Sequence, residues 1–309
     1  MIKKTALVFG ASGQDGTLMC KLLKQEKYKV FAISRGSNFK NHKLVNIKVN
    51  TKKIDVYNQI KIHNLIKNTK CDEIYYFAGQ SSYQDSFKES LLTFKSHNLP
   101  LYYILSSVSK IKKKIKVFNA CSGLIFDVKK KIINENSNLN PNSPYGFSKL
   151  ISYLLVKYFR ENNKIWCMSG IMFNHESNLR NKNHVIPKII NYIKKKNFKK
   201  KLFLGNINII RDWGWAPEYM YFIFQLMKKK VPKDLIIATG KSTKLKDVVK
   251  KAFLDKNINW KNYVQVSKSI INKNESNYFN GNIDLKNLKK YLGKIPSINI
   301  FDILKIMAK

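Results

Sequence analysis

The chain has 309 residues, 44% of them hydrophobic, which is enough for one large α/β domain or for a large domain with a smaller one attached. No apolar run approaches the ~18 residues of a membrane-spanning helix, and the first residues lead directly into a predicted strand, so we expect neither a membrane span nor a signal peptide. The net charge of +39 is nearly all lysine spread over every segment. This spread indicates solvated surface positions rather than a nucleic-acid-binding face, although such a charge would attract a phosphate-bearing substrate.

The four cysteines are scattered along the chain and none of them forms a CxxC pair. Their spacing therefore suggests neither a disulfide framework nor a metal site. We expect a reducing compartment, the cytoplasm.

The first predicted strand, Thr5–Phe9, is followed by glycines at 10, 13 and 16 and then by apolar residues at helical spacing over 17–23. In such a strand–turn–helix unit Gly10 permits the tight turn, Gly13 lets the backbone approach a pyrophosphate, and Gly16 lets the helix pack on the strand. The helix N-terminus then faces the phosphates. The pattern predicts a dinucleotide site; the alternative is an ordinary strand–turn–helix unit.

The residue that ends the second predicted strand, Lys29–Ser34, bears on the choice of cofactor. An acidic residue there would bind the 2′-hydroxyl of NAD, but this chain has Arg35. A guanidinium pairs well with a 2′-phosphate, so we favour NADP over NAD. The alternative is a solvated arginine in a very basic chain.

A weak strand is predicted over 45–49 and a helix over Ile60–Ile66, with Asp55 between them. Asp55 is either an adenine-binding acid or a plain helix N-cap. The next buried strand lies within 72–80, where Ala78 and Gly79 would leave room for the nicotinamide ribose at the carboxyl edge of the sheet.

The polar run Ser81–Phe87 predicts a loop over the cofactor and part of the substrate. A helix is expected over 91–109, and Pro100 should kink or interrupt it. The following strand, Ile115–Ala120, ends close to Ser122.

Tyr145 and Lys149 lie four residues apart at the start of a helix predicted to end near Asn162, so they share one helical face. A neighbouring ammonium favours the phenolate, and such a tyrosine can exchange a proton with a sugar hydroxyl or ketone while a nicotinamide exchanges hydride. The Ser122 hydroxyl can hydrogen-bond the same oxygen. The three residues are the catalytic candidates.

A further buried strand is predicted over 165–173, followed by a basic helix over 185–199. His175 and Glu176 fit a structural hydrogen-bonding pair better than a ligand set, because the next histidine, His184, is too far along the chain for a compact metal motif. No metal site is expected.

The sequence resembles the extended short-chain dehydrogenase/reductases. Within them it resembles the GDP-mannose 4,6-dehydratase family over nearly the whole chain. The matching strings are the glycine turn, Ala78–Ser81, Ser143–Tyr145 with Lys149, Phe173–Ser177, Leu204–Asn206, Arg211–Gly214 and Ile237–Gly240. The resemblance implies hydride transfer from hexose C4 to NADP, loss of water across C5 and C6, and return of hydride to C6.

The residue patterns and the resemblance together predict two binding sets. The cofactor set is Gly10, Ser12, Gly13, Gln14, Asp15, Gly16, Arg35, Asp55, Ala78, Gly79, Gln80, Tyr145, Lys149, Asn174 and Arg180. The substrate set is Ser81, Ser122, Asn174, Lys188 and Arg211.

The chain departs from the family in places that matter for the reaction. The resemblance implies a glutamate two residues after Ser122, as the base that removes the C5 proton, but Leu124 stands there. An arginine and a glutamate that would grip the nucleotide are missing from 278–282, and Leu179 replaces one of a pair of arginines that would reach a neighbouring subunit's cofactor.

We therefore expect a doubly wound Rossmann domain over 1–180, to which 210–240 returns, and a smaller α/β substrate domain mainly over 181–309. The expected substrate is a nucleotide sugar, a GDP-hexose above all, and the expected assembly is a homodimer or homotetramer. Three functions stay open: a 4,6-dehydratase with another base, an NADPH-dependent 4-ketoreductase or epimerase, and a non-catalytic NADP-binding homologue.

Overall fold

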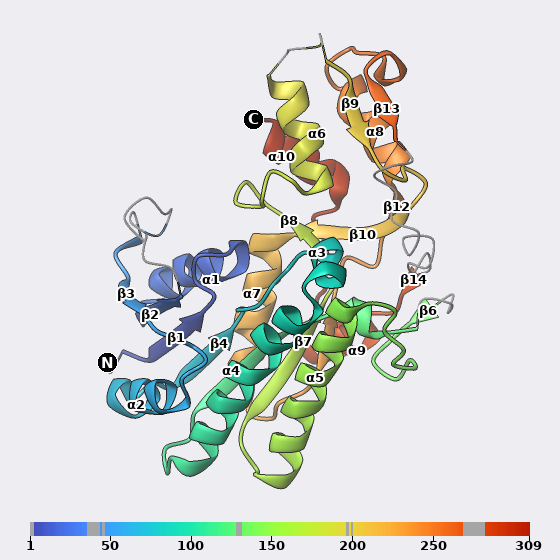
Figure 1. Cartoon of the computed structure of the whole chain (residues 1–309). Coiled ribbons are helices and arrows are strands. Elements are labelled where there is room, and N and C mark those ends of the chain that lie inside the picture. The colour runs from blue at the N-terminus through green and yellow to red at the C-terminus, as the bar shows by residue number, and fades with distance from the viewer. Residues whose placement is uncertain are drawn as a thin grey trace. The chain divides into compact units, whose positions relative to one another are not determined.

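The computed structural model describes residues 3–35, 44, 47–127, 132–195, 198, 200–267 and 282–309 (Figure 1). The chain divides into two compact units. The first consists of Met1–Ile125, Pro141–Met172 and Met220–Leu235, and the second of Phe126–Asn140, Phe173–Tyr219 and Ile236–Lys309. The assignment of these units to cofactor and substrate stays a prediction.

The first unit contains a seven-stranded sheet of the order β11-β7-β5-β4-β1-β2-β3, all but the last two residues of β11. Its strands are β1 (Thr5–Phe9), β2 (Lys29–Ser34), β3 (Asn50–Lys53), β4 (Glu73–Tyr76), β5 (Lys116–Ser122), β7 (Cys167–Met172) and β11 (Leu235–Ile237). The pairs from β7 through to β3 are parallel. The chain winds outward in both directions from β1 and β4, which confirms the doubly wound Rossmann fold and puts a topological switch point at their carboxyl ends.

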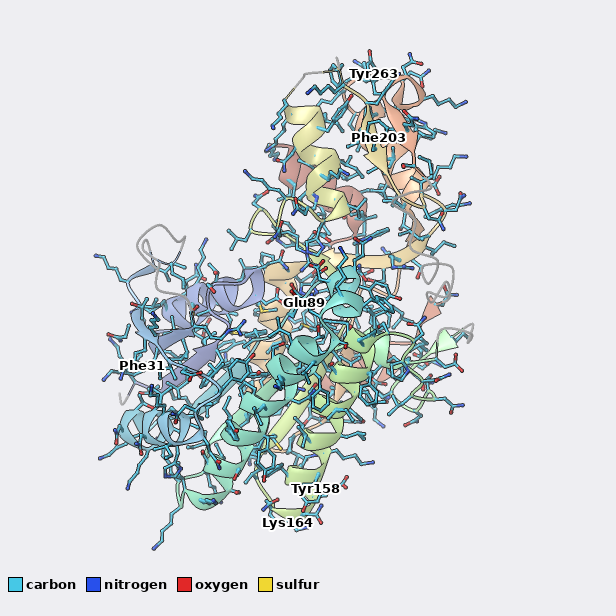
Figure 2. All side chains as sticks on the ribbon, in the orientation of Figure 1. Phe31, Glu89, Tyr158, Lys164, Phe203 and Tyr263 are labelled. Atoms are coloured by element: carbon cyan, nitrogen blue, oxygen red, sulfur yellow. The ribbon has the colours of Figure 1, made fainter. Side chains whose placement is uncertain are left out.

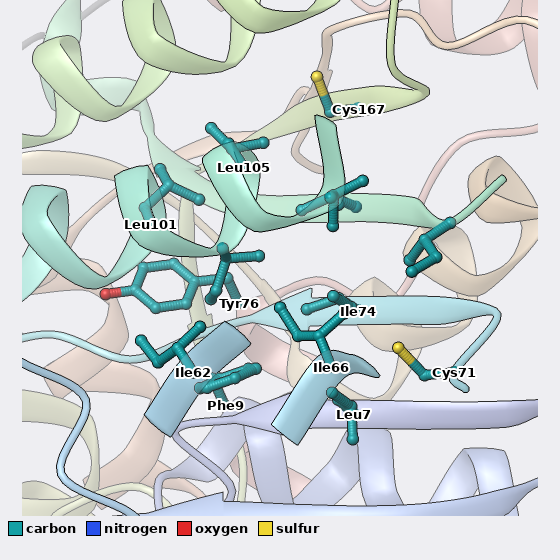
Figure 3. Packing of buried hydrophobic residues seen from close by; sticks show 14 of the residues in the cluster. Leu7, Phe9, Ile62, Ile66, Cys71, Ile74, Tyr76, Leu101, Leu105 and Cys167 are labelled. Carbon is teal, nitrogen blue, oxygen red and sulfur yellow. The ribbon is translucent and has the colours of Figure 1, made fainter. Parts of the chain in front are cut away.

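Helices cover both faces of this sheet (Figure 1). They are α1 (Gln14–Gln25), α2 (Gln59–Thr69), α4 (Ser90–Lys110), α5 (Pro144–Asn162) and α7 (Ala216–Met227). Alternate strand residues point to opposite faces, so Leu7 and Phe9 pack with α2, α4 and α5. Figure 3 shows this packing, with Leu101 and Leu105 of α4 on one side of Tyr76 and Ile74.

Helix α4 runs through Pro100 from Ser90 to Lys110, so the predicted interruption is wrong, and the alternative of a kink stays a prediction. A proline has no N–H, and the carbonyl of Ser96 four residues earlier therefore loses its helical donor. The buried Tyr76 hydroxyl of β4 donates to that carbonyl at 2.7 Å instead. A hydrogen bond from the sheet thus satisfies the group that Pro100 leaves without a helical partner.

Two other local predictions need correction. The weak strand over 45–49 begins at residues outside the described part of the chain, and the observed strand β3 comes one residue later, at Asn50. The polar run after residue 81 is partly helical, forming α3 (Tyr83–Lys88), because Ser82 caps it by accepting a hydrogen bond from Asp85 N at 3.1 Å.

In its described residues the second unit contains three small sheets, ordered β12-β10-β8, β13-β9 and β14-β6. Its strands are β6 (Ile132–Ile133), β8 (Asn174–Glu176), β9 (Leu202–Leu204), β10 (Ile210–Trp215), β12 (Ser242–Lys244), β13 (Val264–Val266) and β14 (Asn282–Ile283). Its helices are α6 (Val185–Lys194), α8 (Leu245–Leu254), α9 (Lys286–Leu292) and α10 (Ile300–Ala308). Buried residues of α6, α8 and α10 form one apolar core with Trp213 of β10. No helix among the described residues is long and apolar enough to cross a membrane.

The bond between Tyr76 and Ser96 gives a stability test. We expect Tyr76→Phe to lower the free energy of unfolding by about 1–3 kcal/mol, because it leaves a buried carbonyl without a donor. In a Pro100→Ala background the cost should fall, since the alanine backbone supplies the missing helical N–H. Urea unfolding of the two single variants and the double variant measures this. An equal cost in both backgrounds would contradict the account.

Candidate active site

The glycine turn joins the end of β1 to the start of α1 and lies against the end of β4. Gly10 has φ +76°, and a Cβ added there would lie 2.7 Å from the backbone nitrogen of Ala78. A Cβ at Gly16 would overlap the Gly10 carbonyl, whereas one at Gly13 would meet only that carbonyl, at 3.3 Å. Gly13 is the N-cap of α1 and makes no side-chain cap bond. The turn therefore leaves open space beside a helix N-terminus, which suits a diphosphate.

The polar residues of this turn make short-range contacts. Ser12 Oγ lies 3.3 Å from Ser34 Oγ at the end of β2, and Gln14 Nε2 donates to Asp15 Oδ1 at 3.0 Å. The carboxyl ends of β1 and β2 are thereby linked where the two strands meet the predicted cofactor.

Arg35 follows β2 and contacts Tyr57, which sequence reasoning did not single out. The Arg35 Nη1 atom donates to the Tyr57 hydroxyl at 3.1 Å, and the guanidinium lies 5.7 Å from the ring centroid. Asp55 Oδ1 accepts from Tyr57 N at 3.0 Å. The alternative of Asp55 as helix N-cap is wrong, because Asn58 caps α2 by accepting from Lys61 N at 3.0 Å. The predicted adenosine end thus gathers Arg35, Tyr57 and Asp55.

The segment after β4 passes along α4. Gly79 has φ +139°, and a Cβ added there would overlap the imidazole of His97. The Gln80 peptide is held at both of its polar groups: its N–H donates to Ser96 Oγ at 3.1 Å, and its carbonyl lies 2.7 Å from His97 Nε2. Ser81, next in the chain, is exposed. The backbone expected to lie under the nicotinamide ribose is therefore anchored from one side.

Helix α5 presents the predicted Tyr–Lys pair. Ser143 caps the helix by accepting from Gly146 N at 3.0 Å, and Pro144 is its first residue. Proline suits this position because its missing N–H has no helical partner there. Tyr145 and Lys149 then lie one turn apart, with the Lys149 ammonium 5.7 Å from the centroid of the Tyr145 ring. The structure brings the two predicted residues together.

The Lys149 ammonium lies inside the protein. The residue is only 6% exposed, and its Nζ donates to the carbonyl of Ala120 on β5 at 2.8 Å. Burial lowers the pKa of Lys149 to about 8, against smaller opposing influences of Cys121 and Asp15. At neutral pH the Lys149 ammonium is still mostly protonated, so its charge can assist a proton transfer by its neighbour.

Ser122 ends β5, next to a short 3₁₀ turn at Gly123–Ile125. Its Oγ accepts a hydrogen bond from Leu124 N at 3.2 Å. A Cβ added at Gly146 would lie 2.5 Å from the Leu124 carbonyl, so this turn packs directly on the start of α5. The hydroxyl can still donate to a substrate oxygen, whereas the Leu124 side chain can neither take nor give a proton.

The remaining predicted site residues belong to the second unit. Asn174 of β8 stands opposite Trp213 of β10, two residues from Arg211. Arg211 Nη1 donates to the carbonyl of Ile210 at 2.7 Å, and Lys188 Nζ donates to that of Phe203 at 2.7 Å. Both cations are bonded to neutral carbonyls here.

Arg180, expected to face a neighbouring subunit's cofactor, lies 3.8 Å from the Glu176 carboxylate of its own chain. His175 Nδ1 lies 2.7 Å from the Phe173 carbonyl, and its ring packs on Tyr219 with centroids 5.1 Å apart. Glu176 thus lies beside Arg180, and the predicted hydrogen-bonding pair of His175 and Glu176 stays a prediction.

The described residues contain no group of three or more histidine, cysteine or acidic side chains that could hold a metal ion. All four cysteines are buried and unpaired. Burial raises the pKa of the Cys20, Cys71, Cys121 and Cys167 thiols to about 12, so they are unreactive at neutral pH.

Comparisons with known proteins agree with the fold described above. Among solved structures, dTDP-glucose 4,6-dehydratase from Bacillus anthracis, in complex with NAD, matches with a TM-score of 0.84 and 18% identity over 99% of this chain and 95% of that one. RMD from Pseudomonas aeruginosa, complexed with NADPH, matches with a TM-score of 0.80 and 16% identity over 99% and 98%. At these identities the likeness shows the fold alone.

The sequence comparisons reach further. GDP-mannose 4,6 dehydratase 1 of Arabidopsis thaliana is 29% identical over 323 aligned positions, which cover 99% of this chain and 89% of that protein. The family model for GDP-mannose 4,6 dehydratase matches residues 7–307. With a Rossmann sheet, a glycine turn and a Tyr–Lys helix already in place, the match over the whole chain shows that this protein belongs to the GDP-mannose 4,6-dehydratase family.

Proposed function

We propose that the chain modifies a nucleotide sugar by exchanging hydride at C4 of the hexose with NADP(H), using Tyr145, Lys149 and Ser122. The observation that carries this proposal is the burial of the Lys149 ammonium one helical turn from the Tyr145 ring, held by the Ala120 carbonyl at 2.8 Å. A protein that only bound the cofactor could use Lys149 as a cofactor contact, but it would have no need of Tyr145, Lys149 and Ser122 together.

Each of the three residues has a separate task. Tyr145 takes the proton of the sugar 4-hydroxyl, or returns it to a 4-ketone. Lys149 favours the phenolate by its positive charge. Ser122 donates a hydrogen bond to the same sugar oxygen, which stabilises the negative charge that develops there.

The cofactor would be held by the cofactor set of the first unit. The open space over Gly13 and the uncapped N-terminus of α1 fit a diphosphate, and Arg35 fits a 2′-phosphate. Ala78 and Gly79 would lie under the nicotinamide ribose. NADP(H), when bound, supplies the hydride acceptor or donor.

The substrate that we propose is a GDP-hexose, because relatives of this chain are named for GDP-mannose. Ser81 and Ser122 of the first unit, and Asn174, Lys188 and Arg211 of the second, would contact it. The second unit would thus be the substrate domain, and Arg180 would contribute to cofactor binding. The four buried, unpaired cysteines fit the reducing compartment, the cytoplasm, that we propose.

Leu124 favours a second candidate within the same chemistry. Dehydration requires a group that removes the C5 proton, and the segment from Cys121 to Phe126 has no carboxylate. A 4-ketoreductase or a 4-epimerase needs only the C4 exchange that Tyr145 and Lys149 can support. The non-catalytic alternative is less well supported, because a protein that only binds the cofactor has no need of Tyr145, Lys149 and Ser122 together.

The expected homodimer or homotetramer stays a prediction, which light scattering of the purified protein would test. Apolar side chains exposed on α4 and α5 support it: Leu91, Leu92, Phe94, Tyr102, Phe147, Leu154 and Tyr158. Tyr158, 57% exposed, is labelled at the foot of α5 in Figure 2.

A product assay tests the reaction. The protein is incubated with GDP-mannose and NADP in deuterated water, and separately with a GDP-4-keto-6-deoxyhexose and NADPH, and products are followed by mass spectrometry and proton NMR. Because of Leu124, we expect intact GDP-mannose but reduction of the keto sugar. Tyr145→Phe should lower that rate about 100-fold or more.

Loss of one water from GDP-mannose with deuterium at C5 would instead establish full dehydration by another base. If the protein binds the cofactor but converts neither sugar, hydride exchange at C4 on these substrates is contradicted.

The cofactor preference rests on Arg35. Hydrogen bonds to charged groups contribute about 1.5–3 kcal/mol, so we expect Arg35→Ala to weaken NADPH binding about 10-fold to 100-fold. NADH lacks the 2′-phosphate, so its affinity should change little. Titration of both cofactors by fluorescence measures this. Lys53→Ala, an exposed cation at the end of the neighbouring strand β3, is the control. An equal loss in the control would point to the general positive field rather than to Arg35.

A further inference from the structure

His97 lies at the reaction centre, yet the proposed chemistry gives it no task. It stands on α4 and is only 2% exposed. Its ring packs against Gly79, where an added Cβ would overlap the Cε1 and Nδ1 atoms. It also meets the Tyr145 ring edge-on, with centroids 5.5 Å apart and planes at 83°. The imidazole therefore touches both the segment expected under the nicotinamide and the phenol expected to move the proton.

The ring also bonds the same segment. His97 Nε2 lies 2.7 Å from the Gln80 carbonyl. Since a carbonyl can only accept, Nε2 must carry the hydrogen. The neighbouring Ser96 hydroxyl accepts from Gln80 N at 3.1 Å. Two consecutive residues of α4 thus hold both polar groups of one peptide, which fixes the position and the tilt of the backbone from Gly79 to Gln80.

The other ring nitrogen has a different environment. Nδ1 is buried and has no hydrogen-bond partner among the described residues. Burial and the positive charge of Lys149 lower the pKa of His97 well below its usual value, so the ring is neutral. Lys149 and Tyr145 are the titratable groups that face it. A second N–H, on Nδ1, would point toward Gly79 and find no acceptor. The packing therefore favours the neutral tautomer with its hydrogen on Nε2.

We propose that His97 is a positioning residue with two roles. Its Nε2 holds the Gly79–Gln80 backbone, and its ring packs edge-on against Tyr145 and holds the phenol in place. It thereby sets the separation between the cofactor-binding segment and the proton-transferring phenol. The inference rests on the proposed function, because this separation matters only if hydride and proton are exchanged there.

The two tasks call on different properties of the side chain, so substitutions can separate them. Leucine fills space but has no donor, and should release the Gln80 carbonyl. Glutamine has an N–H donor that can reach that carbonyl, but it has no ring to brace Tyr145. The matched control is Asn98→Leu, which removes a buried polar side chain from the next position of α4. Within the described part of the chain its Nδ2 donates to Phe94 O at 3.0 Å.

The experiment measures NADPH affinity by fluorescence, and kcat and KM on the converted sugar, for His97→Leu, His97→Gln, Asn98→Leu and the wild type. A displacement of ~1 Å in a reaction centre can lower the rate about 100-fold. We therefore expect His97→Leu to weaken NADPH binding about 10-fold and to lower kcat/KM about 100-fold. His97→Gln should keep NADPH affinity and lose kcat about 10-fold. Asn98→Leu should lower the melting temperature and leave both quantities near wild type.

Wild-type affinity and kcat/KM in His97→Leu would overturn the proposal, as would an equal loss in Asn98→Leu. ¹⁵N NMR of the wild-type imidazoles supplies a test that needs no variant and no activity. We expect the His97 ring to remain the neutral Nε2–H tautomer as the pH falls through ~6.5, the usual histidine pKa. Titration near that pH, or an Nδ1–H tautomer, would overturn the proposal too. A wild-type protein that neither binds NADPH nor converts a sugar would contradict the proposed function, and the NMR result on His97 would still stand.

Discussion

The reaction centre depends on one buried charge. The Lys149 ammonium donates to the Ala120 carbonyl of β5 and lies beside the Tyr145 ring. Burying a cation away from water is unfavourable, and this burial lowers the pKa of Lys149. The charge lies 5.7 Å from the centre of the Tyr145 ring, close enough to favour the phenolate.

The surrounding elements hold this charge in place. Ser143 and Pro144 define where α5 begins, and therefore which turn presents Tyr145 and Lys149. On the other side, α4 holds the Gln80 peptide and places a neutral imidazole, rather than a second cation, against the phenol. Helix α4 can approach β4 closely at this level because Tyr76 bonds the carbonyl that Pro100 leaves without a donor. The sheet, α4 and α5 together thus hold Tyr145, Lys149 and the Gln80 peptide in position.

Much of this is predictable from the sequence. The glycine spacing, the apolar strands and the Tyr–Lys interval are local patterns, and they identify β1, α1, β4, β5 and α5, with both ends exact for β1 and at least one end shifted by one or more residues for the others. The failures are of another kind. Pro100 predicts an interruption of α4, because the sequence around it does not reveal the hydroxyl of Tyr76. In the fold this hydroxyl donates to the Ser96 carbonyl in place of the N–H that proline lacks. Asp55 fits an N-cap by residue type, but Asn58 is three residues nearer the helix. His97 and Tyr57 escape notice because nothing in a single histidine or tyrosine reveals that the fold will bring it against Tyr145 or Arg35.

The central claim is that Lys149 is a buried cation with an altered affinity for its proton. Wild-type protein with ¹³C-labelled lysine side chains, compared with Lys149→Met for assignment, gives its titration directly by NMR of the ε-carbon. The account predicts that one lysine signal, missing from Lys149→Met, titrates near pH 8. A Lys149 signal that titrates with the bulk of the lysines near pH ~10.4 would contradict it.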